Sequence, residues 1–131
     1  MTRAPAELET EALARVAREC PPAHARMHAA LGTRSVELAL GADIVHVTLD
    51  AAALAVPVVH VRASINTLCA VLIGELDVLE AVLSRRLDIT GSPDDLAAAG
   101  DAMTWFLQGA VRCLSIKPLA DELFALRTGE A

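Results

Sequence analysis

The apolar residues of this chain follow two different periods in two separate blocks. Between residues 34 and 64, apolar and polar side chains alternate along RSVELALG, DIVHVTLD and PVVHVRAS, which is typical of half-buried β-strands. Between residues 92 and 114, apolar residues recur every three or four positions, which is typical of an amphipathic helix. Strands and helices that are grouped in this way predict an α+β fold rather than alternating β and α units.

Boundary signals along the chain place the remaining elements. Paired prolines stop a helix, and Gly, Ser and Asp clusters mark turns and helix starts. We expect a single domain over residues 1–131, in which helices cover an antiparallel-dominated sheet. The predicted elements, in order, are a helix over 5–19, at most a short helical turn over 24–31, strands over 34–41, 43–50 and 57–64, short helices over 64–74 and 77–84, a strand over 85–91, a long helix over 92–114 and a final helix over 119–126.

The long helix carries the clearest start signal. Ser92 is a capping residue, Pro93 suits the first helical position, and Asp94 and Asp95 fall in the positively polarised first turn. Trp105 and Phe106 broaden its apolar face. We expect the following stripe to face the rest of the protein: Leu96, Ala99, Gly100, Met103, Leu107, Ala110, Val111 and Leu114.

Composition and charge exclude several classes of function. The chain is 54% hydrophobic but only 2% aromatic, so its core must be aliphatic. A net charge of −6 argues against nucleic acid and against anionic membranes as partners. The longest apolar run, LCAVLIG, is too short to span a bilayer, so we expect no stable membrane insertion. Three isolated cysteines and an acidic N-terminal region without an apolar core favour the cytoplasm.

The sequence contains no motif for nucleophilic catalysis, phosphate binding or metal binding, so we predict no catalytic residues, no metal and no cofactor. His24 and His28 lie four apart, but their surroundings predict two solvated side chains rather than metal ligands. His46, His60 and Arg62 fall on the polar faces of neighbouring strands. They are either an acid–base group or the ordinary polar face of a half-exposed sheet.

Residues 64–96 carry a family resemblance. The segment SINTLCAVLIGELDVLEAVLSRRLDITGSPDDL resembles the middle of the sterol carrier protein type 2 family. The glycine of LIG, the helix residue Ala81 and the strand RRLDITG match the family's order of motifs, and the preceding strands extend the resemblance over about residues 34–110. Arg85 stands where the family commonly has glycine, and Val82 and Leu83 where it commonly has large aromatic residues.

This resemblance implies a five-stranded sheet with an apolar tunnel that carries lipid-like molecules without catalysis. The ligand is then a sterol-like terpenoid, a fatty acyl chain or an isoprenoid, and the helix over 119–126 is a candidate lid. We expect the ligand to contact apolar residues of the three helices that follow the third strand, with Leu79 and Leu83 facing inward. The predicted lining residues are Leu68, Leu72, Leu79, Leu83, Met103, Trp105, Phe106 and Leu107.

Two other functions remain open. In the first, the chain is a homodimer or docks onto a biosynthetic enzyme through an exposed apolar patch of the terminal helix. That patch consists of Leu119, Leu123, Phe124 and Leu126. In the second, the chain is a small isomerase or cyclase that acts on an apolar substrate through His46, His60 and Arg62.

Overall fold

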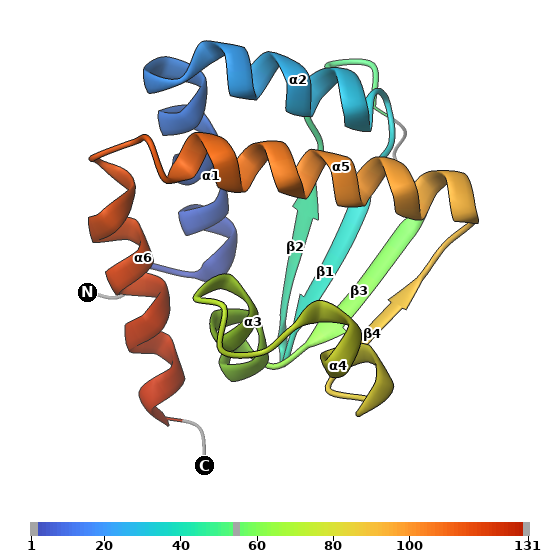
Figure 1. Cartoon of the computed structure of the whole chain (residues 1–131), viewed down its shortest axis with the longest axis vertical. Coiled ribbons are helices and arrows are strands. Elements are labelled where there is room, and N and C mark those ends of the chain that lie inside the picture. Colours follow the sequence, from blue (N-terminus) through green and yellow to red (C-terminus); the bar gives the residue numbers. More distant parts are fainter. Residues whose placement is uncertain (1–2, 54–55, 130–131) are drawn as a thin grey trace.

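The computed structural model describes residues 3–53 and 56–129, which form six α-helices, four strands and a terminal 3₁₀ turn (Figure 1). The α+β class predicted from the periodicity is confirmed. The elements are α1 (Pro5–Glu19), α2 (Pro21–Leu31), β1 (Val36–Leu40), β2 (Asp43–Val47), β3 (Val59–Ala63), α3 (Ile65–Leu72), α4 (Val78–Leu83), β4 (Leu87–Thr90), α5 (Pro93–Ala110), α6 (Ile116–Ala125) and η1 (Leu126–Gly129).

The two N-terminal helices meet at the paired prolines. α1 has the bounds that the sequence predicts, and Cys20 separates it from α2. Pro21 and Pro22 end one helix and begin the next, because a proline in the first turn has no N–H that needs a partner. α2 therefore has 11 residues, and the expectation of a single short turn over 24–31 is wrong. Its buried residues lie four apart, which gives the helix one packing face: Ala23, Met27 and Leu31.

The sheet has four strands in the order β2-β1-β3-β4. β1 pairs antiparallel with β2 and parallel with β3, and β3 pairs antiparallel with β4. The sheet is therefore mixed, and the expectation of a five-stranded, antiparallel-dominated sheet is wrong. The connection over residues 48–58 is long enough to carry the chain back past β1, whereas a tight hairpin would have placed β3 antiparallel on β2.

The strand register separates the side chains into an apolar and a polar face. Glu37 lies opposite both His46 and His60, and Arg62 lies opposite Asp88. These residues form the polar face, on which both histidines, Arg62 and Asp88 are exposed. α3, α4 and α5 lie together in front of the strands in Figure 1. They cover the apolar face, which carries Val36, Leu38, Leu40, Val45, Val47, Val59, Val61, Ala63, Leu87 and Ile89.

The two short helices end in the same hydrogen-bonded motif. After α3, Gly74 has a φ of 79°, and Glu75 N–H donates to Ala70 C=O at 2.9 Å. After α4, Arg85 has a φ of 63°, and Arg86 N–H donates to Ala81 C=O at 2.9 Å. This is the Schellman motif, whose left-handed position favours glycine. Among the described residues, Arg85 alone combines a positive φ with a side chain.

α5 begins as predicted, since the Ser92 hydroxyl accepts a hydrogen bond from Asp95 N–H at 3.2 Å. It ends at Ala110, before the predicted residue 114, because the chain turns there into α6. α6 in turn starts at Ile116, so Pro118 lies in its first turn and does not break the chain. None of the described helices is both long and apolar enough to cross a membrane.

α5 is buried along a different face from the predicted stripe. Ala102 and Gly109 are its buried residues, and Gly109 lies against α1 and α2. Met103 is 47% exposed, and Leu114, just beyond the helix, is 93% exposed. The expectation that the stripe from Leu96 to Leu114 faces the rest of the protein is therefore wrong for five of its eight residues, since Gly100, Leu107 and Val111 are exposed as well.

The buried apolar residues form three separate clusters. The largest joins the sheet to α3, α4 and α6 around Cys69. The second joins α1, α2 and the end of α5 around Val16, and the third joins α2 and α5 around Met27. α5 is thus held mainly by α2, while α3 and α4 are held by the far end of the sheet.

Candidate functional site

The apolar face of the sheet is buried to different extents along its length. At one end, Leu40, Ala63 and Leu87 are buried in the cluster that contains α3 and α4. At the other end, Val59 is buried close to Gly91, where the chain enters α5. Four residues are in register across the middle of this face, and one of them, Val45, is only 1% exposed. The other three are half-buried against the sheet cluster, and we call them the central row: Leu38, Val61 and Ile89.

The predicted lining residues of α3 and α4 have unequal exposure. Leu68 and Leu72 on α3 are half-buried, and Leu68 packs against the sheet cluster. Leu79 is 65% exposed and Leu83 is 74% exposed, so the expectation that they face inward is wrong. α4 turns Ala81 toward the core instead, where it is completely buried.

The predicted lining residues of α5 fall into two groups. Trp105 and Phe106 are half-buried and pack with the cluster around Met27 on α2. The Arg26 guanidinium lies over the Trp105 ring, 4.6 Å from its centroid. Met103 and Leu107 are exposed. They lie next to Phe106 at the edge of the apolar face of α5.

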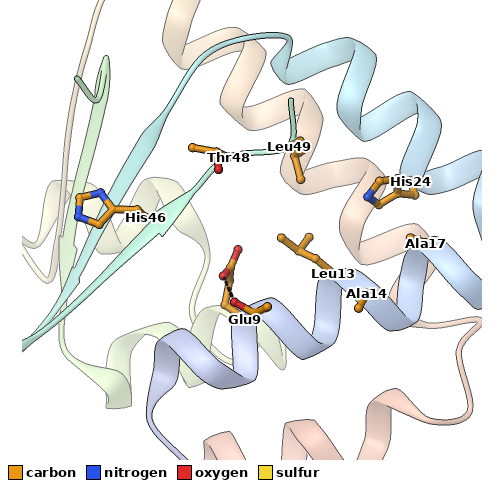
Figure 2. A pocket seen from close by; sticks show the side chains of 9 residues that line it. Glu9, Leu13, Ala14, Ala17, His24, His46, Thr48 and Leu49 are labelled. Carbon is orange, nitrogen blue, oxygen red and sulfur yellow. Dashed lines mark hydrogen bonds between the residues drawn. The ribbon is translucent and has the colours of Figure 1, made fainter. Parts of the chain in front are cut away.

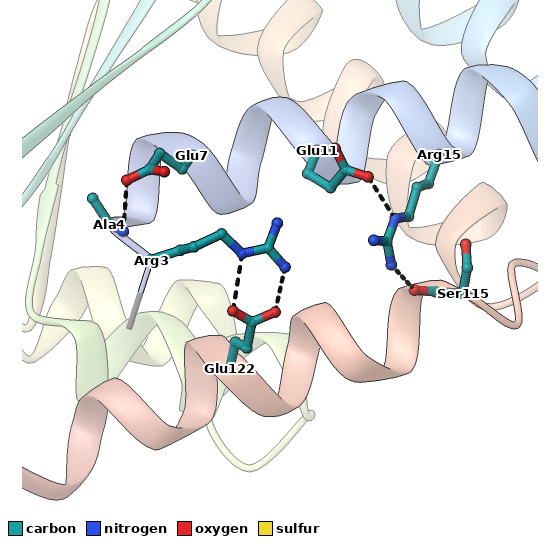
Figure 3. A network of polar contacts seen from close by, with 7 residues as sticks. All are labelled: Arg3, Ala4, Glu7, Glu11, Arg15, Ser115 and Glu122. Carbon is teal, nitrogen blue, oxygen red and sulfur yellow. Dashed lines mark hydrogen bonds and ion pairs between the residues drawn. The ribbon is translucent and has the colours of Figure 1, made fainter. Parts of the chain in front are cut away.

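α6 is fastened to α1 by polar contacts (Figure 3). Arg3 donates to both carboxylate oxygens of Glu122, with Nε 3.0 Å from Oε1. The Arg3 guanidinium lowers the pKa of the Glu122 carboxyl. Arg15 bonds Glu11 at 2.8 Å on its own helix and also donates to the Ser115 carbonyl at the start of α6.

The predicted interaction patch on α6 is largely covered by the rest of the protein. Leu119 is buried, and the other three residues are half-buried against the sheet cluster: Leu123, Phe124 and Leu126. The expectation of an exposed apolar patch on the terminal helix is therefore wrong. The role of that helix as a lid stays a prediction.

The predicted acid–base residues share the polar face of the sheet, but β1 lies between β2 and β3, so the expectation that His46 and His60 lie on neighbouring strands is wrong. His46 and His60 both lie opposite Glu37, whose Oε1 is 3.5 Å from His60 Nδ1. Arg62 lies on the same face, in register with Asp88. All of them face away from the central row, because successive side chains of a strand point to opposite faces. A ligand on the apolar face is therefore separated from these groups by the sheet.

The two histidines of α2 have separate surroundings. His28 Nε2 lies 3.0 Å from Asp50 Oδ2, which ties the segment after β2 to α2. His24 lies on the wall of a hollow between α1, α2 and β2. Within the described ranges, no three His, Cys, Asp or Glu side chains are grouped as metal ligands.

That hollow has a volume of about 380 Å³ and is lined by both polar and apolar side chains (Figure 2). One face of α1 forms its floor, and the end of β2 with the residues after it forms the opposite wall. In Figure 2, Leu13 and Leu49 approach each other from these two sides, and the Glu9 carboxylate points toward Thr48. The lining residues are Glu9, Thr10, Leu13, Ala14, Ala17, His24, His46, Thr48 and Leu49.

Glu9 differs electrostatically from the other acidic residues. Burial raises the pKa of the Glu9 carboxyl, and a hydrogen bond from the Thr10 hydroxyl at 3.3 Å offsets this only in part. In the part of the chain that the structure describes, no cation pairs with Glu9. The pKa of Asp50, at the edge of the same region, is lowered by the Ala52 N–H and by His28.

Sequence reasoning missed this hollow because its lining comes from three elements that are distant along the chain. The local signal was present on α1, where residues 9, 10, 13, 14 and 17 share one face and mix a glutamate with leucine and alanine. A single amphipathic face does not show which neighbouring element will leave part of it uncovered.

Comparisons with models of protein families, with curated proteins and with solved structures give no match for this chain. The resemblance to sterol carrier proteins therefore stays a prediction from the sequence.

Proposed function

We propose that this protein binds an apolar, lipid-like molecule on the apolar face of its sheet, between α5 and the α3–α4 segment. The observation that carries this proposal is the central row: Leu38, Val61 and Ile89 are half-buried in a place where the sheets of small domains normally meet a continuous core. The ligand is a sterol-like terpenoid, a fatty acyl chain or an isoprenoid, and its binding involves no covalent step.

Exposed aliphatic residues on the flanking helices support the same site. α5 exposes Met103 and Leu107, and α4 exposes Leu79 and Leu83. Exposed aliphatic side chains on two helices are typical of an interaction or ligand-binding surface.

The energy available from this surface is sufficient for carriage. Apolar burial contributes about 25 cal/mol per Å². A ligand that buries roughly 400 Å² therefore gains about 10 kcal/mol before the costs of association and ordering, which take several kcal/mol. The expected dissociation constants are micromolar, which suits a carrier that must also release its ligand.

The first experiment is native mass spectrometry of the freshly purified chain, followed by organic extraction. A co-purified lipid, or saturable binding of a fluorescent polyene fatty acid, supports the proposal. A ligand-free protein that also fails to bind the polyene probe overturns it.

A matched pair of variants locates the site. Met103→Trp adds bulk on the side of α5 that we assign to the ligand, and because Met103 is half exposed, the larger ring has room without disturbing the core. Gln108→Trp adds the same bulk on the polar side of α5, where Gln108 is exposed. We expect Met103→Trp to abolish probe binding and Gln108→Trp to retain it, with matching circular dichroism spectra. Equal binding by the two variants contradicts this placement of the ligand.

A further inference from the structure

We propose that the hollow between α1, α2 and β2 is a second, separate binding site, which takes an elongated organic cation with an ammonium head and an aliphatic body. Glu9 receives the ammonium group, and Leu13 and Leu49 enclose the aliphatic body. This site lies outside the central row and does not depend on lipid binding there.

The arrangement of charge in the hollow selects a cation. Among the groups that line it, Glu9 is the one carboxylate, and in Figure 2 it points toward Thr48. The described residues His24 and His46 also line the hollow, and neither forms an ion pair with Glu9. Its Oε2 has the Thr10 hydroxyl as a weak partner at 3.3 Å, and that hydroxyl also donates to the Ala6 carbonyl at 3.0 Å. A half-buried carboxylate without a cation keeps a strong capacity to accept charge-assisted hydrogen bonds.

Three other carboxylates on the helices are already paired with arginines. Glu11 is paired with Arg15 at 2.8 Å, Asp95 with Arg34 at 2.8 Å, and Glu122 with Arg3. A ligand cation that approaches α1 or α5 therefore gains most at Glu9. Each of these three carboxylates would first have to give up an arginine.

The apolar walls set the shape of the ligand. Glu9 and Ala17 lie eight residues apart on one face of α1, and α-helical rise converts this to about 12 Å along the floor of the hollow. Leu13 and Ala14 occupy the middle of that length. In Figure 2, His24 lies across from Ala17 at that end of the hollow. A head group at Glu9 therefore leaves room for an unbranched aliphatic chain of similar length, lying parallel to α1.

A series of probes with one chain and three head groups tests the inference. Octylammonium, octanol and octanoate are titrated into the ¹⁵N-labelled chain in an amine-free buffer at pH 8, and amide shifts are followed. We expect octylammonium to shift Thr10, Leu13 and Leu49 in a saturable way, and octanoate to leave them unmoved. Equal shifts with octanoate, or octylammonium shifts confined to Val61 and Ile89, overturn the second site. The latter result leaves the lipid site of the central row intact.

Substitution of the carboxylate supplies the second readout. Glu9→Gln keeps the shape of the side chain, and we expect it to weaken octylammonium binding about tenfold, the loss for one charge-assisted hydrogen bond. Asp101→Asn removes one negative charge from the exposed side of α5 and is expected to bind like the parent chain. Undiminished octylammonium binding by Glu9→Gln, or an equal loss in both variants, overturns the role of Glu9.

Discussion

Two glycines of α5 provide a direct test of how this helix is packed. A Cβ placed on Gly109 would lie 2.9 Å from the Ala23 Cβ and 2.9 Å from Val16 Cγ1, whereas one placed on Gly100 meets no atom within 4 Å. Both positions are helical, so alanine gains about 1 kcal/mol of intrinsic propensity at either one. At Gly109 this gain is opposed by overpacking, which typically costs about 1–3 kcal/mol.

We therefore expect Gly100→Ala to raise the free energy of unfolding by about 1 kcal/mol. The free energy of unfolding of Gly109→Ala is expected to be about 1–3 kcal/mol lower than that of Gly100→Ala, because only the methyl group at residue 109 must push α1 and α2 away. Urea denaturation followed by circular dichroism measures both changes. For a chain of this size, each kcal/mol corresponds to a shift of roughly 3–5 °C in Tm. If the two variants prove equally stable, α5 does not pack on α1 and α2 at Gly109.

The remaining predictions concern a helix end and two carboxylates. Arg85→Gly is expected to raise the free energy of unfolding by up to about 1 kcal/mol, because glycine adopts the left-handed conformation without strain; a loss of stability in urea denaturation would contradict this. Burial raises the pKa of Glu9, so the ionised carboxylate opposes folding above the unfolded pKa of about 4.3. Glu9→Gln should therefore stabilise the protein near pH 7 but not below that pKa. The Arg34 hydrogen bond lowers the pKa of Asp95, so Asp95→Asn should destabilise at pH 7, and this difference should vanish as the pH falls through the lowered folded pKa. Urea titrations between pH 3 and 7 check both carboxylates, and parallel stability profiles for parent and variants would refute both assignments.

The parts of the fold that could be predicted from the sequence are those specified by local chemistry. The bounds of α1 follow from Pro5 and the prolines after Cys20, and the starts of α3 and α5 follow from Ser64 and Ser92. In each case the decisive interaction joins residues only a few positions apart, as when the Ser64 hydroxyl accepts from Thr67 N–H at 3.0 Å. The periodicity also separated strands from helices correctly.

The arrangement of the strands could not be predicted in this way. Alternation shows that a segment is a strand but not which neighbour it pairs with, so the parallel pairing of β1 with β3 has no local signature. The polar face illustrates the same limit. His46 and His60 were predicted to lie near each other, and the register places both opposite Glu37. That their face is opposite to the central row depends on the pairing of whole strands.

The exposed side of α5 shows why hydrophobicity alone did not identify the buried face. The apolar arc of this helix is wider than one neighbour can cover. α2 packs against the part that carries Ala102 and Gly109, because these small residues let two helix backbones approach closely, as the 2.9 Å distances at Gly109 record. The larger Met103 and Leu107 would hold α2 further away, so they are left beside the packed face rather than within it. Close packing on α2 thus determines the position of α5, and the aliphatic residues left over are those that we assign to the ligand.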